Sequence, residues 1–145
     1  MKIPVNLDGI VEPKPVPAGR YDLVITAVEE TKTKELGKPQ LRVSIAIAGH
    51  ETAPNVTHFI GLNSPGDDPN KAQFKSLMLK RFLSLFKIPN DSSGFDTDDF
   101  LGATAAAELG LSDPDESGNV YNRLFVPKMI NEGSVSRPPS VKKVA

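Results

Sequence analysis

The feature that most constrains the fold is the order in which strand-like and helix-like patterns follow one another. Three segments with apolar residues at alternate positions come first, and a segment with helical spacing follows at 70–87. Two further alternating segments complete the order, the last at 121–126. Strands repeat every second residue and helices about every 3.6 residues. The chain therefore predicts a mainly β domain in which one helix separates three strands from two.

The first two strands differ in the composition of their faces. The first begins at Gly19 and has apolar residues at both odd and even positions up to Val28, which predicts cover on both faces. A polar connection follows at 32–38 and ends at Pro39. The second strand alternates most clearly, so Arg42 should point away from the core. Its core face is expected to consist of Leu41, Val43, Ile45 and Ile47.

The third strand, at 56–62, leaves one aromatic position open to two interpretations. If Ile60 and Leu62 face the core, Phe59 is exposed and offers a surface on which a base can stack. If the register slips at Gly61, Phe59 belongs to the core instead.

The helix at 70–87 is expected to close one end of a barrel formed by the strands. Asp67 or Asp68 can cap its N-terminus, with Pro69 at or near the first turn. Leu79 and Leu83 lie off the main apolar stripe and could contact a partner chain. The main stripe consists of Phe74, Leu77, Met78, Phe82, Leu85 and Phe86.

The last two strands, at 103–109 and 121–126, flank a polar turn at 112–118. The first of them has small side chains, which allow close approach of backbone or ligand. In the second, Leu124 and Val126 are the expected core residues. The opposite face then carries an outward row of Tyr121, Arg123 and Phe125. The alternative is that the N-terminal segment covers this row and the aromatic rings pack across strands.

Together these elements have the order of a five-stranded OB-fold barrel with one amphipathic α-helix between strands 3 and 4. Residues 1–18 are expected to form an extended arm, because prolines alternate with other residues up to Pro17. Residues 19–130 are assigned to the OB-fold domain, and residues 131–145 to a flexible basic tail.

Several classes of site are excluded or disfavoured by composition. The chain has no cysteine, which excludes disulfides and thiolate metal sites. It has no glycine-rich phosphate loop, no nucleophile elbow and no apolar run long enough for a membrane span. The acidic side chains of Asp96, Asp98 and Asp99 could suggest a metal cluster, but capping of a short helical turn explains them. We therefore expect no catalysis, no cofactor, no metal and no membrane partner.

Charge is divided along the chain although the net charge is only −1. Residues 70–89 contain five basic side chains and no acid, whereas residues 91–116 contain eight acids and no Lys or Arg. Such blocks allow a basic face on a neutral protein. The alternative is that each block is ordinary solvated surface.

Outward aromatic and basic side chains on barrel strands favour sequence-tolerant binding of single-stranded nucleic acid. Aromatic rings stack on bases, and a guanidinium such as that of Arg123 pairs with phosphate or stacks itself. These residue types do not decide between DNA and RNA. The expected binding residues are Lys32, Lys34, Lys38, Arg42, Phe59, Tyr121, Arg123, Phe125 and Lys128.

Several segments, taken in order, resemble bacteriophage single-stranded DNA-binding proteins of the DUF669 type. They are residues 17–21, the lysine-rich turn leading to 37–41, the helix end at 86–89, residues 100–102, and the pair Asn122 and Arg123. The resemblance covers roughly 17–128. It implies an OB fold that coats single-stranded DNA during phage replication or recombination, in the cytoplasm of the bacterial host.

The resemblance also implies phage replication or recombination proteins as further partners. Many single-stranded DNA-binding proteins recruit partners through an acidic tail, whereas residues 134–145 are basic and could add nonspecific DNA affinity. The competing hypothesis is a non-enzymatic adaptor that docks such an enzyme through the helix face around Leu79 and Leu83 and through the free N-terminal arm. A homo-oligomer formed through an edge strand or the arm is a further expectation.

Overall fold

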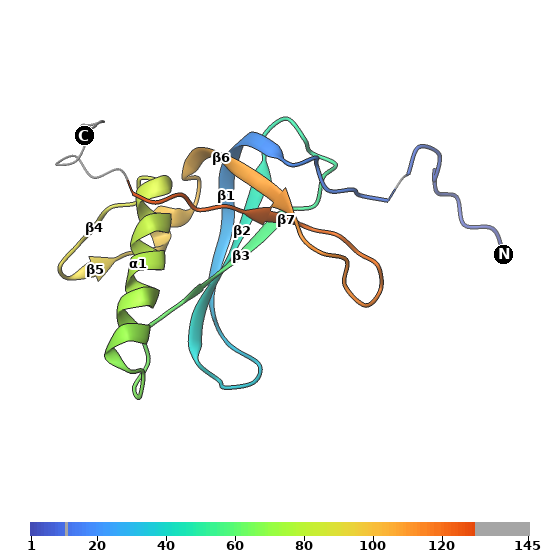
Figure 1. The fold of residues 1–145 in the computed structure, drawn as a ribbon. Coiled ribbons are helices and arrows are strands. Elements are labelled where there is room, and N and C mark those ends of the chain that lie inside the picture. Colours follow the sequence, from blue (N-terminus) through green and yellow to red (C-terminus); the bar gives the residue numbers. More distant parts are fainter. Residues whose placement is uncertain (11, 130–145) are drawn as a thin grey trace.

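One continuous antiparallel sheet forms the body of the protein. A computed structural model describes residues 1–10 and 12–129 of the chain. The sheet has the strand order β3-β2-β1-β6-β7 (Figure 1). Its strands are β1 (Gly19–Lys32), β2 (Pro39–Ile47), β3 (Val56–Gly61), β6 (Thr104–Leu111) and β7 (Asn122–Leu124). The helix α1 (Pro69–Leu85) follows β3, and α1 is separated from β6 by β4 (Asn90–Asp91), β5 (Gly94–Phe95) and the short 3-10 helix η1 (Thr97–Phe100).

The two outer strands of this sheet, β3 and β7, contact each other, so the sheet curls into a nearly closed barrel. Each of the four strand pairings is antiparallel, and β3 and β7 therefore run in the same direction along the seam where they meet. This is the arrangement of an OB-like barrel, with its single helix between the third and fourth barrel strands. The predicted fold class is confirmed.

The core is formed by one face of β2 together with buried residues of β1, β3, α1, η1 and β6. Leu41, Val43, Ile45 and Ile47 are all buried, as their alternation predicts. In β1, Leu23 and Ile25 are buried, but a register shift between Ile25 and Ala27 reverses the alternation. Val28 consequently packs against the core while Ala27 is exposed. The apolar residues on both sides of β1 therefore reflect a β-bulge in large part, and the prediction of two covered faces was wrong on this point.

The helix α1 packs against the barrel through its C-terminal half. Phe82, Leu83 and Phe86 are buried, whereas Phe74 is 60% exposed and Leu77 36% exposed. The predicted stripe was therefore wrong at Phe74 and Leu77, and Leu83 is a core residue, not part of a free face. The reason is an aromatic cluster at this end of the helix. The Phe82 ring lies with its centroid 5.3 Å from His58, 4.9 Å from Phe86 and 5.8 Å from Phe100.

Both ends of α1 are capped by specific contacts. The carboxylate of Asp68 accepts a hydrogen bond from the backbone N–H of Lys71 at 2.8 Å, so Asp68, not Asp67, is the N-cap. At the other end Lys87 has a left-handed φ of 55°. The Ile88 N–H donates to the Leu83 carbonyl at 2.8 Å, and Ile88 is buried. This is a Schellman-type ending, in which the residue beyond the left-handed position packs back onto the helix.

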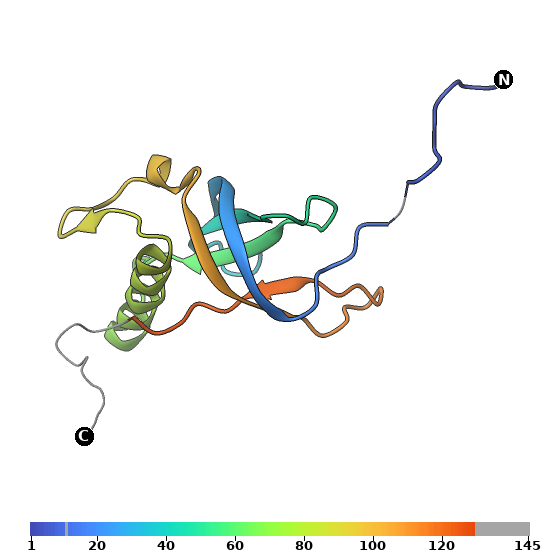
Figure 2. The ribbon, with the colours of Figure 1, turned by 90° about the horizontal axis from the view of Figure 1, so that it is seen from above.

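The N-terminal segment joins the barrel at one buried residue. Val16 is 5% exposed, and its backbone N–H and C=O bond to the side-chain amide of Asn122 at 2.9 and 2.8 Å. Residues 1–10 are exposed and extend away from the barrel (Figures 1 and 2). The predicted arm is therefore attached to β7 through the main chain of Val16, which bonds to the side chain of Asn122. The predicted tail at 131–145 lies outside the described residues.

Candidate nucleic-acid interface

The outward row on and around β7 is exposed as the sequence predicts. Tyr121 is 52% exposed and Phe125 55% exposed, and Arg123 between them is also exposed. Arg123 pairs in register with Gly110 of β6, and apart from the chain neighbours of Gly110 no atom lies within 4 Å of the place that a Cβ atom would take there. Because both aromatic rings are open to solvent, the alternative in which the N-terminal segment covers this row is wrong.

The loop between β6 and β7 holds Tyr121 in place. The carboxylate of Asp115 accepts hydrogen bonds from the backbone N–H groups of Ser117 and Asn119, both at 2.9 Å. The Tyr121 hydroxyl donates to the other Asp115 oxygen at 3.2 Å. These contacts, led by that with Asn119, lower the pKa of Asp115. Asp115 therefore joins the loop to the Tyr121 hydroxyl and orients the Tyr121 side chain.

A second pair of candidate residues lies on β2 and β3. Arg42 and Phe59 are neighbours in the β2–β3 register, and Phe59 is 54% exposed. The register slip that would have buried Phe59 does not occur. A guanidinium nitrogen of Arg42 lies 3.2 Å from a carboxylate oxygen of Glu29, with both side chains more than half exposed. Since β3 and β7 meet at the seam, Phe59 lies on the strand that borders the β7 row, and Arg42 lies one strand further away.

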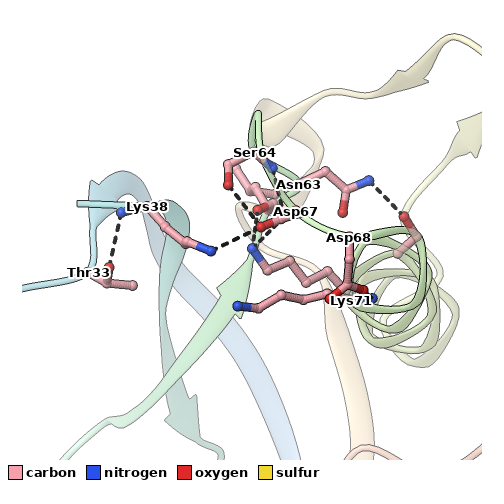
Figure 3. Close-up of polar contacts among 10 residues, drawn as sticks. Thr33, Lys38, Asn63, Ser64, Asp67, Asp68 and Lys71 are labelled. Carbon is pink, nitrogen blue, oxygen red and sulfur yellow. Dashed lines mark hydrogen bonds and ion pairs between the residues drawn. The ribbon is translucent and has the colours of Figure 1, made fainter. Parts of the chain in front are cut away.

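The candidate lysines do not all join that face. Lys32 and Lys34 are exposed at the tip of the β1–β2 hairpin, which Figure 3 places beside the start of α1. Lys38 is only 28% exposed at its side chain, and its ammonium lies 3.1 Å from Asp67. Lys128 is exposed on the segment after β7, which runs toward α1 in both Figure 1 and Figure 2. The hairpin lysines therefore extend the candidate interface toward the helix.

Asp67 connects the hairpin to the helix. Its side chain is 2% exposed, and its two oxygens lie 3.1 Å from the Lys38 ammonium and 2.9 Å from the Lys75 ammonium (Figure 3). The backbone N–H of Ser64 also donates to it at 3.0 Å. These bonds, that with Lys75 first, hold the pKa of Asp67 well below its ordinary value. The bond with Asp67 in turn raises the pKa of Lys38.

Two further residues beside this junction were not among the predicted binding residues. Lys71 lies on the first turn of α1 and reaches toward Lys38 (Figure 3). Phe74, one turn along, is 60% exposed. The available signal was the acid-free basic block at 70–89, but the apolar stripe assigned Phe74 to the core.

The acidic cluster of Asp96, Asp98 and Asp99 includes the residue that caps η1. Asp96 caps η1 by accepting a hydrogen bond from the Asp98 N–H at 2.9 Å. Across residues 1–10 and 12–129, no three His, Asp or Glu side chains are grouped so that they could hold a metal ion.

No helix in the same residues combines the length and the apolar character that crossing a membrane requires.

The chain matches none of the protein-family models and none of the curated proteins with which it was compared. The resemblance to phage single-stranded DNA-binding proteins therefore depends on the sequence segments named above.

Proposed function

We propose that this protein binds single-stranded DNA with little sequence preference across the outward face of β2, β3 and β7. The observation that carries the proposal is the exposed row of Tyr121, Arg123 and Phe125 beside the seam with β3, which carries the exposed Phe59. An OB-like barrel is a frequent scaffold for such binding.

The chemistry of this face suits a single strand better than a duplex. Unpaired bases expose flat faces that stack on aromatic rings whatever the base, at about 1–3 kcal/mol for each base. In a duplex those faces are already stacked on neighbouring base pairs, and sequence is read from the groove edges instead. Arg42 and Arg123 lie among the aromatic side chains and can contact the phosphates between stacked bases.

The resemblance to phage proteins supports a more specific role. We infer that the protein coats single-stranded DNA during phage replication or recombination in the bacterial host cytoplasm, without catalysing a reaction. Replication or recombination proteins would be its further partners, and a homo-oligomer formed through an edge β-strand or the arm is also part of the proposal. The DNA assignment over RNA comes from the resemblance, since stacking serves both.

The adaptor hypothesis has less support. Its helix face is not free, because Leu83 is 3% exposed and Leu79 packs against the core. A partner would have to displace core contacts in order to use that face, which leaves the exposed arm at residues 1–10 as the docking segment of this hypothesis.

Substituting the β7 row tests the proposal. Tyr121→Ala and Arg123→Ala should each weaken binding of a labelled oligo-dT by about fivefold or more, because one stacking or phosphate contact is lost. Both side chains are exposed, so the fold should be retained. Fluorescence anisotropy measures the affinity and circular dichroism checks the fold.

The matched controls are Leu101→Ala, which removes another exposed apolar side chain, and Lys80→Ala, which removes a charge on α1. Both controls should bind as the unmodified protein does. If Tyr121→Ala and Arg123→Ala retain full affinity, the assignment of this face is wrong.

A further inference from the structure

Two depressions adjoin at the junction of β3, α1 and the β1–β2 hairpin. One has a volume of about 360 Å³ and is lined in part by Lys34, Lys38 and Pro39. The other has a volume of about 370 Å³ and is lined in part by Phe59, Phe74 and Met78. Both are also lined by Gly61, Lys71 and Lys75. We call the combined depression the hairpin–helix groove.

The cations of this groove are not equally engaged. Asp67 lies within 3.1 Å of Lys38 and 2.9 Å of Lys75, so these two ammonium groups already have a carboxylate partner. In the part of the chain that the structure describes, Lys71 has no carboxylate oxygen within the 4.0 Å of an ion pair. It faces Lys38 instead (Figure 3), and this neighbouring ammonium lowers the pKa of Lys71. An anion bound here would relieve the repulsion between the two lysines.

The acids around the groove leave it with excess positive charge. Glu35 lines the hairpin side, and Asp68 caps α1 through its contact with the Lys71 N–H. Asp67 is buried and has both oxygens occupied. The groove therefore has four lysines against the three carboxylates just named. Of these lysines, Lys34 and Lys71 are exposed, whereas Lys38 and Lys75 are partly buried.

The floor and walls offer apolar surface at the same place. The aliphatic part of Lys75 lies over Gly61, where a Cβ atom would be 3.7 Å from its carbons. Phe74 is 60% exposed on one side, and Phe59 is 54% exposed on the other. Phe59 also belongs to the outward face proposed above for DNA. The groove is therefore continuous with that face.

We propose that the hairpin–helix groove is a second subsite for the same DNA strand, in which Lys71 contacts a phosphate and Phe74 stacks a base. This inference rests on the proposed function. Exposed aromatic rings beside unpaired cations match a single-stranded nucleic acid, which presents bases and phosphates in alternation. The strand would leave the barrel face at Phe59 and continue between the hairpin and α1.

Variants on α1 test this subsite. Lys71→Ala should weaken binding of an oligo-dT of about 20 nucleotides and reduce the slope of log K against log salt by about 0.7, as expected for one lost phosphate contact. Phe74→Ala should weaken binding about fivefold or more, with less change in the salt slope. Alanine is a good helix former, so neither exposed substitution should unfold α1.

Lys80→Ala and Leu77→Ala are the matched controls on the same helix, because neither residue lines the groove. If the unmodified protein binds oligo-dT and both groove variants bind equally well with the same salt slope, the subsite is wrong while the barrel-face proposal stands. If Tyr121→Ala and Arg123→Ala have no effect but the groove variants do, DNA uses the groove and the barrel-face proposal is wrong. If the unmodified protein does not bind oligo-dT, both proposals are overturned.

Discussion

At the scale of single residues, Arg42 and Lys38 carry the same charge on the same hairpin but differ in their carboxylate partners. Arg42 contacts Glu29 with both side chains more than half exposed, whereas Lys38 contacts Asp67, whose side chain is 2% exposed. Exposed ion pairs contribute about 0–1 kcal/mol, so Arg42 can exchange Glu29 for a phosphate at little cost. Lys38 is more firmly engaged, and its main role in this account is to hold the hairpin against α1.

Neutralising Glu29 should therefore improve DNA binding. We predict that Glu29→Gln raises the affinity for oligo-dT by about twofold to fivefold at low salt, because Arg42 loses its competing carboxylate. Anisotropy titrations measure the change. Glu30→Gln, which removes the same charge at the next residue of β1, is the control and should have a smaller effect. An unchanged or lower affinity for Glu29→Gln would count against Arg42 as a DNA contact.

At the scale of elements, Asp67 joins the β1–β2 hairpin to α1 through Lys38 and Lys75. The pKa of Asp67 is held below its ordinary value of 3.8 in the folded protein. A carboxyl group with a lowered folded pKa stabilises the fold fully above its unfolded pKa, and this stabilisation is lost as pH falls toward the folded pKa. The link between hairpin and helix should therefore weaken in acid and not near neutral pH.

Urea denaturation of Asp67→Asn tests this link. The variant should be less stable than the unmodified protein at pH 7, and the difference in unfolding free energy should stay constant down to about pH 5. Below about pH 4 the difference should shrink, because the carboxyl group then becomes protonated in the unfolded chain. Asp113→Asn, on an exposed loop, should leave the urea midpoint nearly unchanged. A difference that grows in acid would contradict the assigned role of Asp67.

The same elements explain which parts of the structure the sequence could predict. Strand β2 was predicted well because its residues alternate with a period of two, and only one of its faces carries large apolar side chains. Phe74 and Leu83 were assigned to the wrong sides, since periodicity reveals an apolar stripe but not how far a neighbouring element covers it. The contact between Lys38 and Asp67 joins residues 29 apart in the chain, a pairing that local patterns do not specify.

The candidate site was predictable to a similar extent. The outward direction of Tyr121, Arg123 and Phe125 follows from alternation around Leu124, and the structure confirms their exposure. The grouping of Lys71 and Phe74 with Phe59 was not predictable, because it depends on where α1 lies against β3. Bulges such as the one between Ile25 and Ala27 also escape a strict period of two.

At the scale of the whole molecule, the protein is a nearly closed barrel, and the proposed path of the DNA strand runs along one side of it. The path begins at the β7 row, crosses the seam to Phe59 and continues into the hairpin–helix groove. Four acids, Asp91, Asp96, Asp98 and Asp99, lie in the segment between α1 and β6. The β4–β5 hairpin of this segment projects beside α1 (Figure 1), whereas Phe100 of η1 is buried in the core. A protein with a net charge of −1 can thus present cations to DNA and keep these four carboxylates elsewhere, whereas Asp115 lies against Tyr121 on the proposed face.

The measurement that tests the central claim most directly is a salt-dependent anisotropy titration of labelled oligo-dT, with a duplex of equal length as control. We predict binding to the single strand that weakens linearly in log K against log salt, by about 0.7 for each phosphate contacted, and much weaker binding to the duplex. Absence of binding to oligo-dT at low salt, or equal affinity for the duplex, would contradict the account.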